Sequence, residues 1–249
     1  MPRFDEGLRK ATLVMGLNRD SRGGWGKGGG LGNTGLPPRV DGAYRAGVVM
    51  ASDLLPDSIL IRPDILCRLD FPALFGNGAP VELELGAGDG SFLLRYAEAH
   101  PGSNFLGVER LFGRLRKIDR KGRRLGLGNL RGLRLEATYL LDWMIPPGSL
   151  SALHVYFPDP WPKKRHHHRR LINPAFAALA AKALRPGGRF HCRTDDASYF
   201  EQMLEVFHGA SEHFVAGREP EGLLEVKTDF ERLFNAEGIQ TRHATWVRR

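Results

Sequence analysis

Short apolar segments alternate with longer amphipathic ones from about residue 55 onward, and this alternation constrains the fold more than any other feature. Apolar runs of five or six residues predict buried strands, and apolar positions at helical spacing predict helices. Strands separated by such helices form βαβ units. The expected fold is therefore α/β, with a doubly wound, mostly parallel sheet of about seven strands and helices on both faces. The expected strands are 81–85, 104–109, 130–135, 153–157 and 189–193, and the expected helices are 91–100, 111–125, 174–184 and 199–207.

The size and the cysteine content exclude several classes of protein. A chain of 249 residues suits a single domain of ordinary size. Its two cysteines, Cys67 and Cys192, are far apart and have no Cys or His at ligand spacing, which argues against a secreted disulfide scaffold and a zinc site. No apolar run approaches the roughly 18 residues of a membrane span, and the N-terminus has no signal-peptide core. We expect a cytoplasmic protein.

The N-terminal segment differs in composition from the rest of the chain. Eight of the fourteen residues in 22–35 are glycine, and such a segment cannot regain its backbone entropy through burial. We expect residues 1–50 to form a basic, disordered tail and residues 55–249 to form the folded domain. Two interpretations of the tail stay open: a flexible extension without a specific role, or an auxiliary arm that contacts RNA.

The positive charge is concentrated in two places. The formal net charge is +8, which favours polyanionic partners. Residues 110–134 hold ten Lys and Arg against Asp119 alone, and residues 163–170 hold five Lys and Arg and no acidic residue. The basic helix at 112–125 is either a solvated face or a platform for an RNA backbone.

A glycine-rich loop follows the strand at 81–85. Glycines at 86, 88 and 90 give the pattern G-x-G-x-G, in which bare backbone can approach a ligand. Glu84 precedes this loop, where a carboxylate could meet an amino group. Glu109 closes the next strand, where an acid can accept from both hydroxyls of a ribose. The alternatives are a purely structural turn and a solvated strand end.

Residues 157–170 read Phe-Pro-Asp-Pro-Trp-Pro-Lys-Lys-Arg-His-His-His-Arg-Arg. The run places a carboxylate, Asp159, and an aromatic side chain, Trp161, directly before a basic cluster. It follows an expected strand, and ligands bind at the carboxyl ends of strands in open α/β sheets. Trp161 either stacks on a base or packs between the two prolines. The histidines 166–168 contact phosphate or lie on a solvated surface, and their spacing argues against a metal site.

The acids around the glycine loop resemble the Rossmann-like methyltransferases that use S-adenosylmethionine. In that class an acid precedes the glycine loop, as Glu84 does here, and another ends the second strand, as Glu109 does. Glu136, after the expected third strand, occupies the place where the class puts a polar group beside adenine. The resemblance implies S-adenosylmethionine as the cofactor. The cofactor-binding residues that it implies are Glu84, Gly86, Gly88, Gly90, Glu109, Glu136 and Asp159.

Within this class, the run at 157–170 resembles the bacterial tRNA (guanine-N7)-methyltransferases. Four further segments resemble the family: 104–109, 129–131, 187–195 and the Thr-Asp-Phe-Glu sequence at 228–231. The resemblance implies methylation of N7 of guanine 46 in the tRNA variable loop. Asp159 and Asp195 are the candidate catalytic carboxylates, with Asp159 favoured for its place in the loop, and the alternative for Asp159 is a role in holding the cofactor only. The substrate-binding residues that the resemblance implies are Lys163, Asp195, Thr228, Asp229, Phe230 and Glu231.

Two other functions are compatible with these patterns. The same cofactor could serve transfer to another RNA or to a protein, or the fold could be an RNA-binding module without catalysis. The expected partner is tRNA, and we expect neither a membrane nor a metal ion to take part. A monomer and a homodimer fit the sequence equally well.

Overall fold

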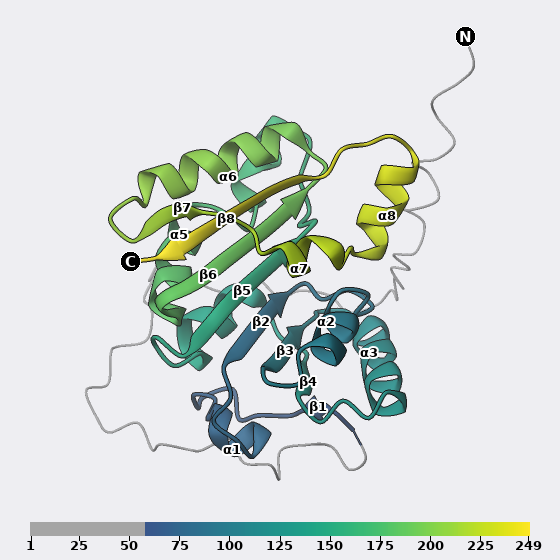
Figure 1. Ribbon diagram of the computed structural model, residues 1–249. Coiled ribbons are helices and arrows are strands. Elements are labelled where there is room, and N and C mark those ends of the chain that lie inside the picture. The colour runs from purple at the N-terminus through teal and green to yellow at the C-terminus, as the bar shows by residue number, and fades with distance from the viewer. Residues whose placement is uncertain (1–57) are drawn as a thin grey trace, which may run out of the picture. The chain divides into compact units, whose positions relative to one another are not determined.

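The computed structural model describes residues 58–249, and the expected tail at 1–50 lies outside the described residues. The described chain forms an eight-stranded sheet in the order β1-β4-β3-β2-β5-β6-β8-β7 (Figure 1). All neighbours pair in parallel except β8, which is antiparallel to both β6 and β7. The strands are β1 (Leu60–Ile61), β2 (Val81–Leu85), β3 (Asn104–Val108), β4 (Leu130–Leu133), β5 (Leu150–Tyr156), β6 (Leu184–Thr194), β7 (Phe214–Gly217) and β8 (Arg242–Arg248). The expected α/β fold with a mostly parallel sheet is confirmed.

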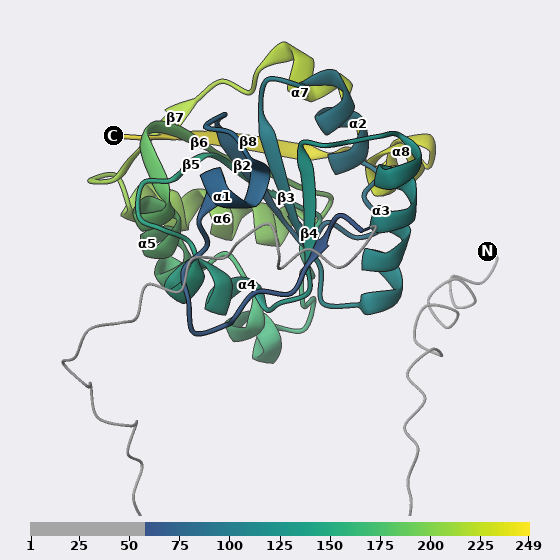
Figure 2. The same cartoon turned by 90° about the horizontal axis from the view of Figure 1, so that it is seen from below.

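Helices cover both faces of the sheet, with α2 and α7 on one side and α5 and α6 on the other (Figure 2). None of the helices within residues 58–249 has both the length and the apolar character that a membrane crossing requires. The helical elements are α1 (Phe71–Phe75), α2 (Leu93–Ala99), α3 (Phe112–Arg124), α4 (Ala137–Tyr139), the π-helix η2 (Leu140–Met144), the 3-10 helix η3 (Lys164–Arg169), α5 (Pro174–Ala183), α6 (Ala197–Gly209), α7 (Glu221–Glu225) and α8 (Asp229–Ala236).

The two faces of the central strands carry different side chains. The positions that alternate toward α5 and α6 are apolar and belong to the larger core cluster, as Leu83, Leu153 and Phe190 do. The alternate positions on the same strands are polar but still buried. They include Glu84, His154, Tyr156, His191 and Arg193, which lie in register across β2, β5 and β6.

The direction in which the strands are added reverses between β2 and β5. The chain adds β3 and β4 on one side of β2, and it then returns to add β6 on the far side of β5. In doubly wound sheets, ligands bind outside the carboxyl ends of the strands at such a switch point. Leu85 pairs with Val155, so the loops that follow β2 and β5 leave the sheet side by side. These are the two loops on which the sequence places the cofactor and target chemistry.

The structure corrects several expected boundaries. The strands expected at 104–109 and 130–135 end at Val108 and Leu133, and the strand expected at 153–157 begins earlier, at Leu150. The strand expected at 189–193 begins earlier, at Leu184, so that the Pro-Gly-Gly sequence at 186–188 lies inside β6, where the pairing with β5 shifts register. Irregular pairing accommodates proline and glycine at that point of the strand.

Two interpretations of the basic segments were also wrong. The helical spacing of Leu111, Leu115, Ile118 and Leu125 predicts one apolar stripe on the helix at 112–125, but the exposed fractions of Leu111 and Leu125 are 56% and 41%. Leu115, Ile118 and Gly122 are the buried residues of that helix, and Leu111 and Leu125 lie just beyond its ends. The sequence around the histidines 166–168 predicts a loop, but they lie in the 3-10 helix η3.

Candidate active site

The glycine loop after β2 has an open backbone. Gly86, Gly88 and Gly90 have φ angles of 77°, 57° and 81°, in the left-handed region that favours glycine. A Cβ atom on Gly90 would lie 2.9 Å from Cγ1 of Ile118, so this glycine permits close packing of α3 on the loop. A Cβ on Gly86 would meet no atom within 4 Å, which leaves room for a ligand.

Glu84 is the carboxylate at the base of this loop, and its exposed fraction is only 3%. Its Oε2 atom has no hydrogen-bond partner within the described residues. Burial raises the pKa of Glu84 to about 8, and the nearby Arg193 opposes that rise. A buried acceptor without a donor is costly. An incoming amino group would therefore satisfy Glu84, so the residue fits the amino end of an amino-acid cofactor.

Glu109 follows β3 directly and is 7% exposed, so it is not a solvated strand end. Its Oε2 accepts from the backbone N–H of Gly88 at 3.1 Å, and its Oε1 accepts from that of Leu111 at 2.8 Å. Each carboxylate oxygen has a second lone pair and can accept another bond. The side chain is thereby held beside the glycine loop with acceptor capacity left for hydroxyl groups.

Glu136 lies near the same end of the sheet but is exposed. Its two oxygens accept from the backbone N–H groups of Thr138 at 3.0 Å and Tyr139 at 2.8 Å, so it caps α4. With Arg110, Arg134 and Leu135 it lines a shallow pocket. Arg110 directly follows Glu109, so this pocket adjoins the end of β3 that carries Glu109. This placement fits a flat ring bound beside Glu136.

The loop after β5 holds its backbone in a strained conformation. Phe157 and Trp161 have φ angles of 50° and 46°, which are rare for residues other than glycine. Asp159 lies between them and is exposed, and its Oδ1 accepts from the backbone N–H of Trp161 at 3.0 Å. Such conformations persist only where the surroundings fix them, and they cluster at functional sites. The turn thus holds the Asp159 carboxylate at the end of β5.

The basic run continues from this turn. Lys163 is exposed and immediately precedes η3. Trp161 is half-buried between Arg169, whose guanidinium lies 5.0 Å from the ring centroid, and His166 at 5.8 Å. Base stacking and local packing both remain compatible with that position. Among residues 58–249, no three His, Cys, Asp or Glu side chains group in a way that would hold a metal ion.

The sequence at 228–231 lies against the cofactor side of the fold. Asp229 donates its backbone N–H to Oγ of Ser91 at 3.0 Å, just after the glycine loop. Phe230 is 51% exposed, and its ring centroid lies 6.3 Å from that of Phe157. The structure therefore brings this segment to both central loops.

The four residues of that sequence do not face the same way. The exposed fractions of Thr228 and Glu231 are 5% and 2%, so both are buried. Thr228 caps α8 through the N–H of Glu231. Only Asp229 and Phe230 are exposed. Asp195, the remaining expected substrate residue, is half-buried after β6, and its backbone carbonyl accepts from Arg242 at 3.0 Å.

Two buried arginines that support these loops were missed by sequence reasoning. Arg170 donates Nε to the carbonyl of Pro160 at 2.8 Å and Nη1 to Gln202 at 2.9 Å, so it anchors the turn that carries Asp159. Arg193 anchors the segment that includes Glu231. Arg170 ends a basic run and was counted among surface charges. Arg193 is the last residue of the strand expected at 189–193, and a charged residue in a buried strand was the signal that could have indicated a buried ion pair.

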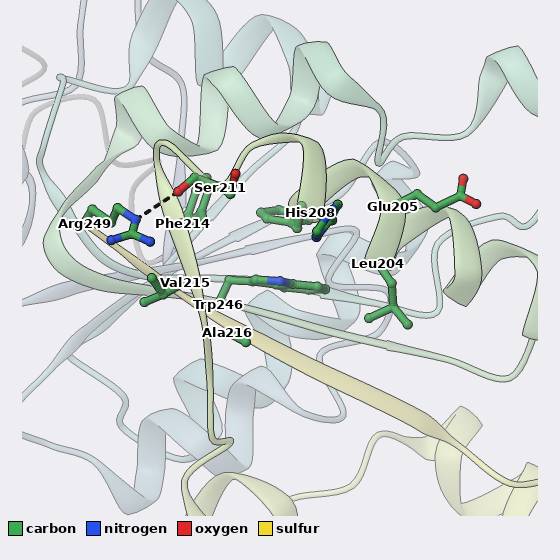
Figure 3. A pocket seen from close by; sticks show the side chains of 10 residues that line it. Leu204, Glu205, His208, Ser211, Phe214, Val215, Ala216, Trp246 and Arg249 are labelled. Carbon is green, nitrogen blue, oxygen red and sulfur yellow. Dashed lines mark hydrogen bonds between the residues drawn. The ribbon is translucent and has the colours of Figure 1, made fainter.

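A second pocket lies far from this site. It has a volume of about 620 Å³ and is formed by α6, β7 and the end of β8 (Figure 3). Trp246 and Arg249 line it, with Arg249 donating Nε to the carbonyl of Ser211 at 2.9 Å. Phe214, at the start of β7, pairs with Arg248 at the end of β8, whereas Arg242, at the start of β8, pairs with Thr194 at the carboxyl end of β6. The pocket is therefore at the opposite end of the sheet from the two central loops.

Solved structures with the same fold include a 16S rRNA methyltransferase, KamB, with a TM-score of 0.53 and 19% identity, covering 72% of this chain and 92% of that chain. A structure described as an antibiotic-related methyltransferase gives a TM-score of 0.50 with 17% identity, covering 70% of this chain and 89% of that chain. At these identities the similarity establishes the fold alone.

Similarity in sequence is closer. A family model described as "Putative methyltransferase" matches residues 78–242. A tRNA (guanine-N(7)-)-methyltransferase of Bordetella pertussis is 42% identical over 180 residues, covering 72% of this chain and 69% of the relative. One from Methylococcus capsulatus is 38% identical over 185 residues, covering 74% of this chain and 79% of the relative. The chain is a methyltransferase and belongs to the tRNA (guanine-N7)-methyltransferase family.

Proposed function

We propose that this protein transfers the methyl group of S-adenosylmethionine to N7 of guanine 46 in the variable loop of tRNA. The observation that carries the proposal is the switch point between β2 and β5. There Glu84, a buried carboxylate whose Oε2 atom has no donor among the described residues, lies at the base of an open glycine loop, and the next loop presents Asp159 before a basic run. The substrate named for the relatives, tRNA, fits that basic run.

Four acids and the glycine loop would hold the cofactor. Glu84 would accept from the amino group, Glu109 would accept from the ribose hydroxyls, Glu136 would lie beside the adenine, and Asp159 would line the same pocket. Gly86, Gly88 and Gly90 let the ligand approach the backbone. When bound, the cofactor supplies a methyl group that is already activated on a sulfonium.

The reaction would require little acid–base chemistry from the protein. In the methyl transfer, N7 would supply the electron pair of the new bond, and the sulfur of the bound cofactor would keep the electron pair of the bond that is broken. No proton would have to leave N7. Alignment of the reacting atoms can contribute roughly 7–11 kcal/mol.

Asp159 is the proposed catalytic carboxylate. Methyl transfer moves positive charge onto the guanine, so a carboxylate near it stabilises the transition state more than the reactants. Lys163 and the basic run of η3 hold the RNA backbone, while Asp195, Asp229 and Phe230 border the target base. Thr228 and Glu231 complete the substrate side from within the fold.

Methyl transfer tests the proposal directly. Purified protein, labelled S-adenosylmethionine and a tRNA transcript should yield 7-methylguanosine on nucleoside analysis. A transcript with adenine at position 46 is the matched control and should remain unlabelled. Label in protein, in another nucleoside, or equally in the adenine transcript would contradict the proposal. Failure of the folded protein to bind the cofactor in calorimetry would favour a non-catalytic RNA-binding module.

A further inference from the structure

A cluster of charged side chains is buried beneath the proposed target site, and the proposed chemistry uses none of them directly. Arg193, at the end of β6, has an exposed fraction of 0%. Its guanidinium forms ion pairs with Glu219 at 2.7 Å and Glu231 at 2.9 Å. His243, which pairs with Arg193 across β6 and β8, contacts the same two carboxylates at 3.0 and 3.6 Å.

Every N–H group of the Arg193 guanidinium is used, and all of them bond one segment. Arginine has five donors in a planar fork. Nε and one Nη2 donor bond Oε1 of Glu219, and the other Nη2 donor bonds the carbonyl of Leu223 at 2.6 Å. The two Nη1 donors bond the carbonyl of Val226 and Oε2 of Glu231, both at 2.9 Å. A single side chain thus fastens residues 219–231 to the sheet.

The fastened segment divides into an inner and an outer side. Thr228 and Glu231 are buried, and Glu231 meets Arg193. Asp229 and Phe230 are exposed next to the proposed target site. The outer side is held from the cofactor side as well, because Arg95 on α2 donates to the carbonyl of Lys227 at 2.6 Å. The place of Phe230 therefore depends on contacts made beneath it.

The cluster is also poorly explained as a device for stability alone. Buried ion pairs lose much of their Coulombic gain to desolvation, and apolar side chains of similar volume often stabilise a protein as well or better. Hydrogen bonds from His243 and the charge of Arg193 lower the pKa of Glu219 although burial opposes its ionisation. What the cluster provides that apolar packing would not is a fixed orientation of the segment.

We propose that Arg193 is a positioning residue for methyl transfer, which fixes residues 219–231 so that Phe230 and Asp229 border the target nucleotide. Thr228 and Glu231 act through this clamp and make no contact with the RNA. The inference rests on the proposed function for its effect on tRNA, but the clamp itself is a property of the free protein.

The clamp is tested first without substrate. Hydrogen exchange of residues 219–236 is compared in the wild-type protein, in Arg193→Lys and in Glu231→Leu. Arg189→Lys and Glu237→Gln, at exposed positions on the same strand and next to α8, are matched controls. We expect exchange of the segment to rise about tenfold or more in the two clamp variants, since local opening governs protection. Exchange that is unchanged, or that rises equally throughout the fold, would overturn the clamp whatever the activity of the protein.

Its effect on the reaction is read from kinetics below the unfolding transition of each variant. We expect the tRNA KM to rise or kcat to fall by up to about 100-fold, the effect of a displacement near 1 Å, while cofactor Kd changes little in Glu231→Leu. Glu231→Gln, which can still accept from Arg193, should recover most of the loss. The double variant Arg193→Lys/Glu231→Leu should be no worse than the poorer single variant.

Other outcomes refute the inference. Losses that multiply in the double variant, or Glu231→Gln as damaging as Glu231→Leu, would mean that Glu231 contacts the RNA itself. A lower melting temperature with unchanged KM and kcat would reduce the cluster to a stabilising role. A wild-type protein that modifies no tRNA guanine would refute the proposed function and the role of the clamp in it, while the exchange experiment would still report on the clamp.

Discussion

The two loops at the centre of the sheet are held in place in different ways. The loop after β2 depends on residues close to its strand end: Glu84, glycines with positive φ, and a bond from Gly88 to Glu109. The loop after β5 depends on Arg170, which joins the carbonyl of Pro160 to Gln202, 32 residues further along the chain. The first loop is specified by a local pattern and the second by long-range polar contacts. We therefore expect substitutions in the two halves to fail in different ways.

Loss of the Glu84 charge should have the largest effect and should be confined to the cofactor. In Glu84→Gln the buried partner of the proposed amino group is removed. Truncating one side of such a charge pair costs about 2–5 kcal/mol, which weakens Kd from roughly thirtyfold to several thousandfold. Titration calorimetry with the cofactor measures this change.

The loss of binding should be specific to the cofactor. Filter binding of tRNA to Glu84→Gln should match the wild-type protein, because Glu84 lies beneath the glycine loop and not on the basic surface. Glu98→Gln, at an exposed position on α2, is the control and should bind the cofactor normally. Equal losses of cofactor and tRNA binding in Glu84→Gln would contradict the proposal that Glu84 serves the cofactor alone.

Loss of Arg170 should act on the fold and on turnover together. Arg170→Met fills similar volume but leaves the Pro160 carbonyl and the Gln202 side chain without their donor. We expect the free energy of unfolding to fall by about 3 kcal/mol, as for a broken buried charged network. We also expect kcat/KM to fall by up to about 100-fold as the Asp159 turn shifts. Urea unfolding and steady-state kinetics measure the two quantities.

A matched arginine separates this effect from a simple loss of charge. Arg185 is exposed at the start of β6, so Arg185→Met should change the free energy of unfolding by less than about 0.5 kcal/mol. If Arg170→Met were as stable as Arg185→Met, the turn would be held by its own prolines and not by the distant contacts.

The features that depend on neighbouring residues could be predicted from the sequence, whereas those that depend on distant contacts could not. The strands from β2 to β6 and the helices α2, α3, α5 and α6 were predicted close to their observed positions, because each shows in a few neighbouring residues. The helical elements α4, η2 and η3 were not predicted, and the roles of Glu84 and Glu109 stay predictions. The strands β7 and β8 were not predicted. β7 is only four residues long, and β8 carries polar residues on one side, so neither has a continuous apolar run.

The buried polar face of the sheet was also beyond the sequence pattern. His154 is 1% exposed, and its two ring nitrogens form hydrogen bonds with Tyr156 and Glu82. His191 forms a hydrogen bond with Thr245 on β8. Burial is permitted by partners on other strands. No local pattern in the sequence predicts these partners. The contacts between Arg193 and residues 219–231 are likewise not predicted by any local pattern.

The pH dependence of cofactor binding tests whether Glu84 must lose its proton when the cofactor binds. Burial raises the pKa of Glu84 to about 8, so the unliganded side chain is protonated at lower pH. A cationic amino group pairs with the carboxylate, so binding must release that proton. We expect affinity to fall about tenfold per pH unit from pH 7.5 to 6, with proton release seen as calorimetric heats that depend on the buffer. Glu84→Gln should show no such dependence. A flat profile in the wild-type protein would mean that Glu84 is ionised without the ligand.

The smallest expected effect is electrostatic and compares the basic surfaces of the two halves. Replacing Lys163, Lys164 and Arg165 with alanine should flatten the log–log salt dependence of tRNA binding by about 2, since each lost phosphate contact removes roughly 0.7–0.9. The matched control replaces Arg116, Lys117 and Arg120, which are exposed on α3. We expect a smaller change there, because the target must reach the end of β5, whereas α3 adjoins the cofactor loop. An unchanged slope for the first triple variant would show that these three residues make no phosphate contacts with the RNA. An equal drop for both triple variants would mean that the RNA-binding surface includes α3 as well as η3.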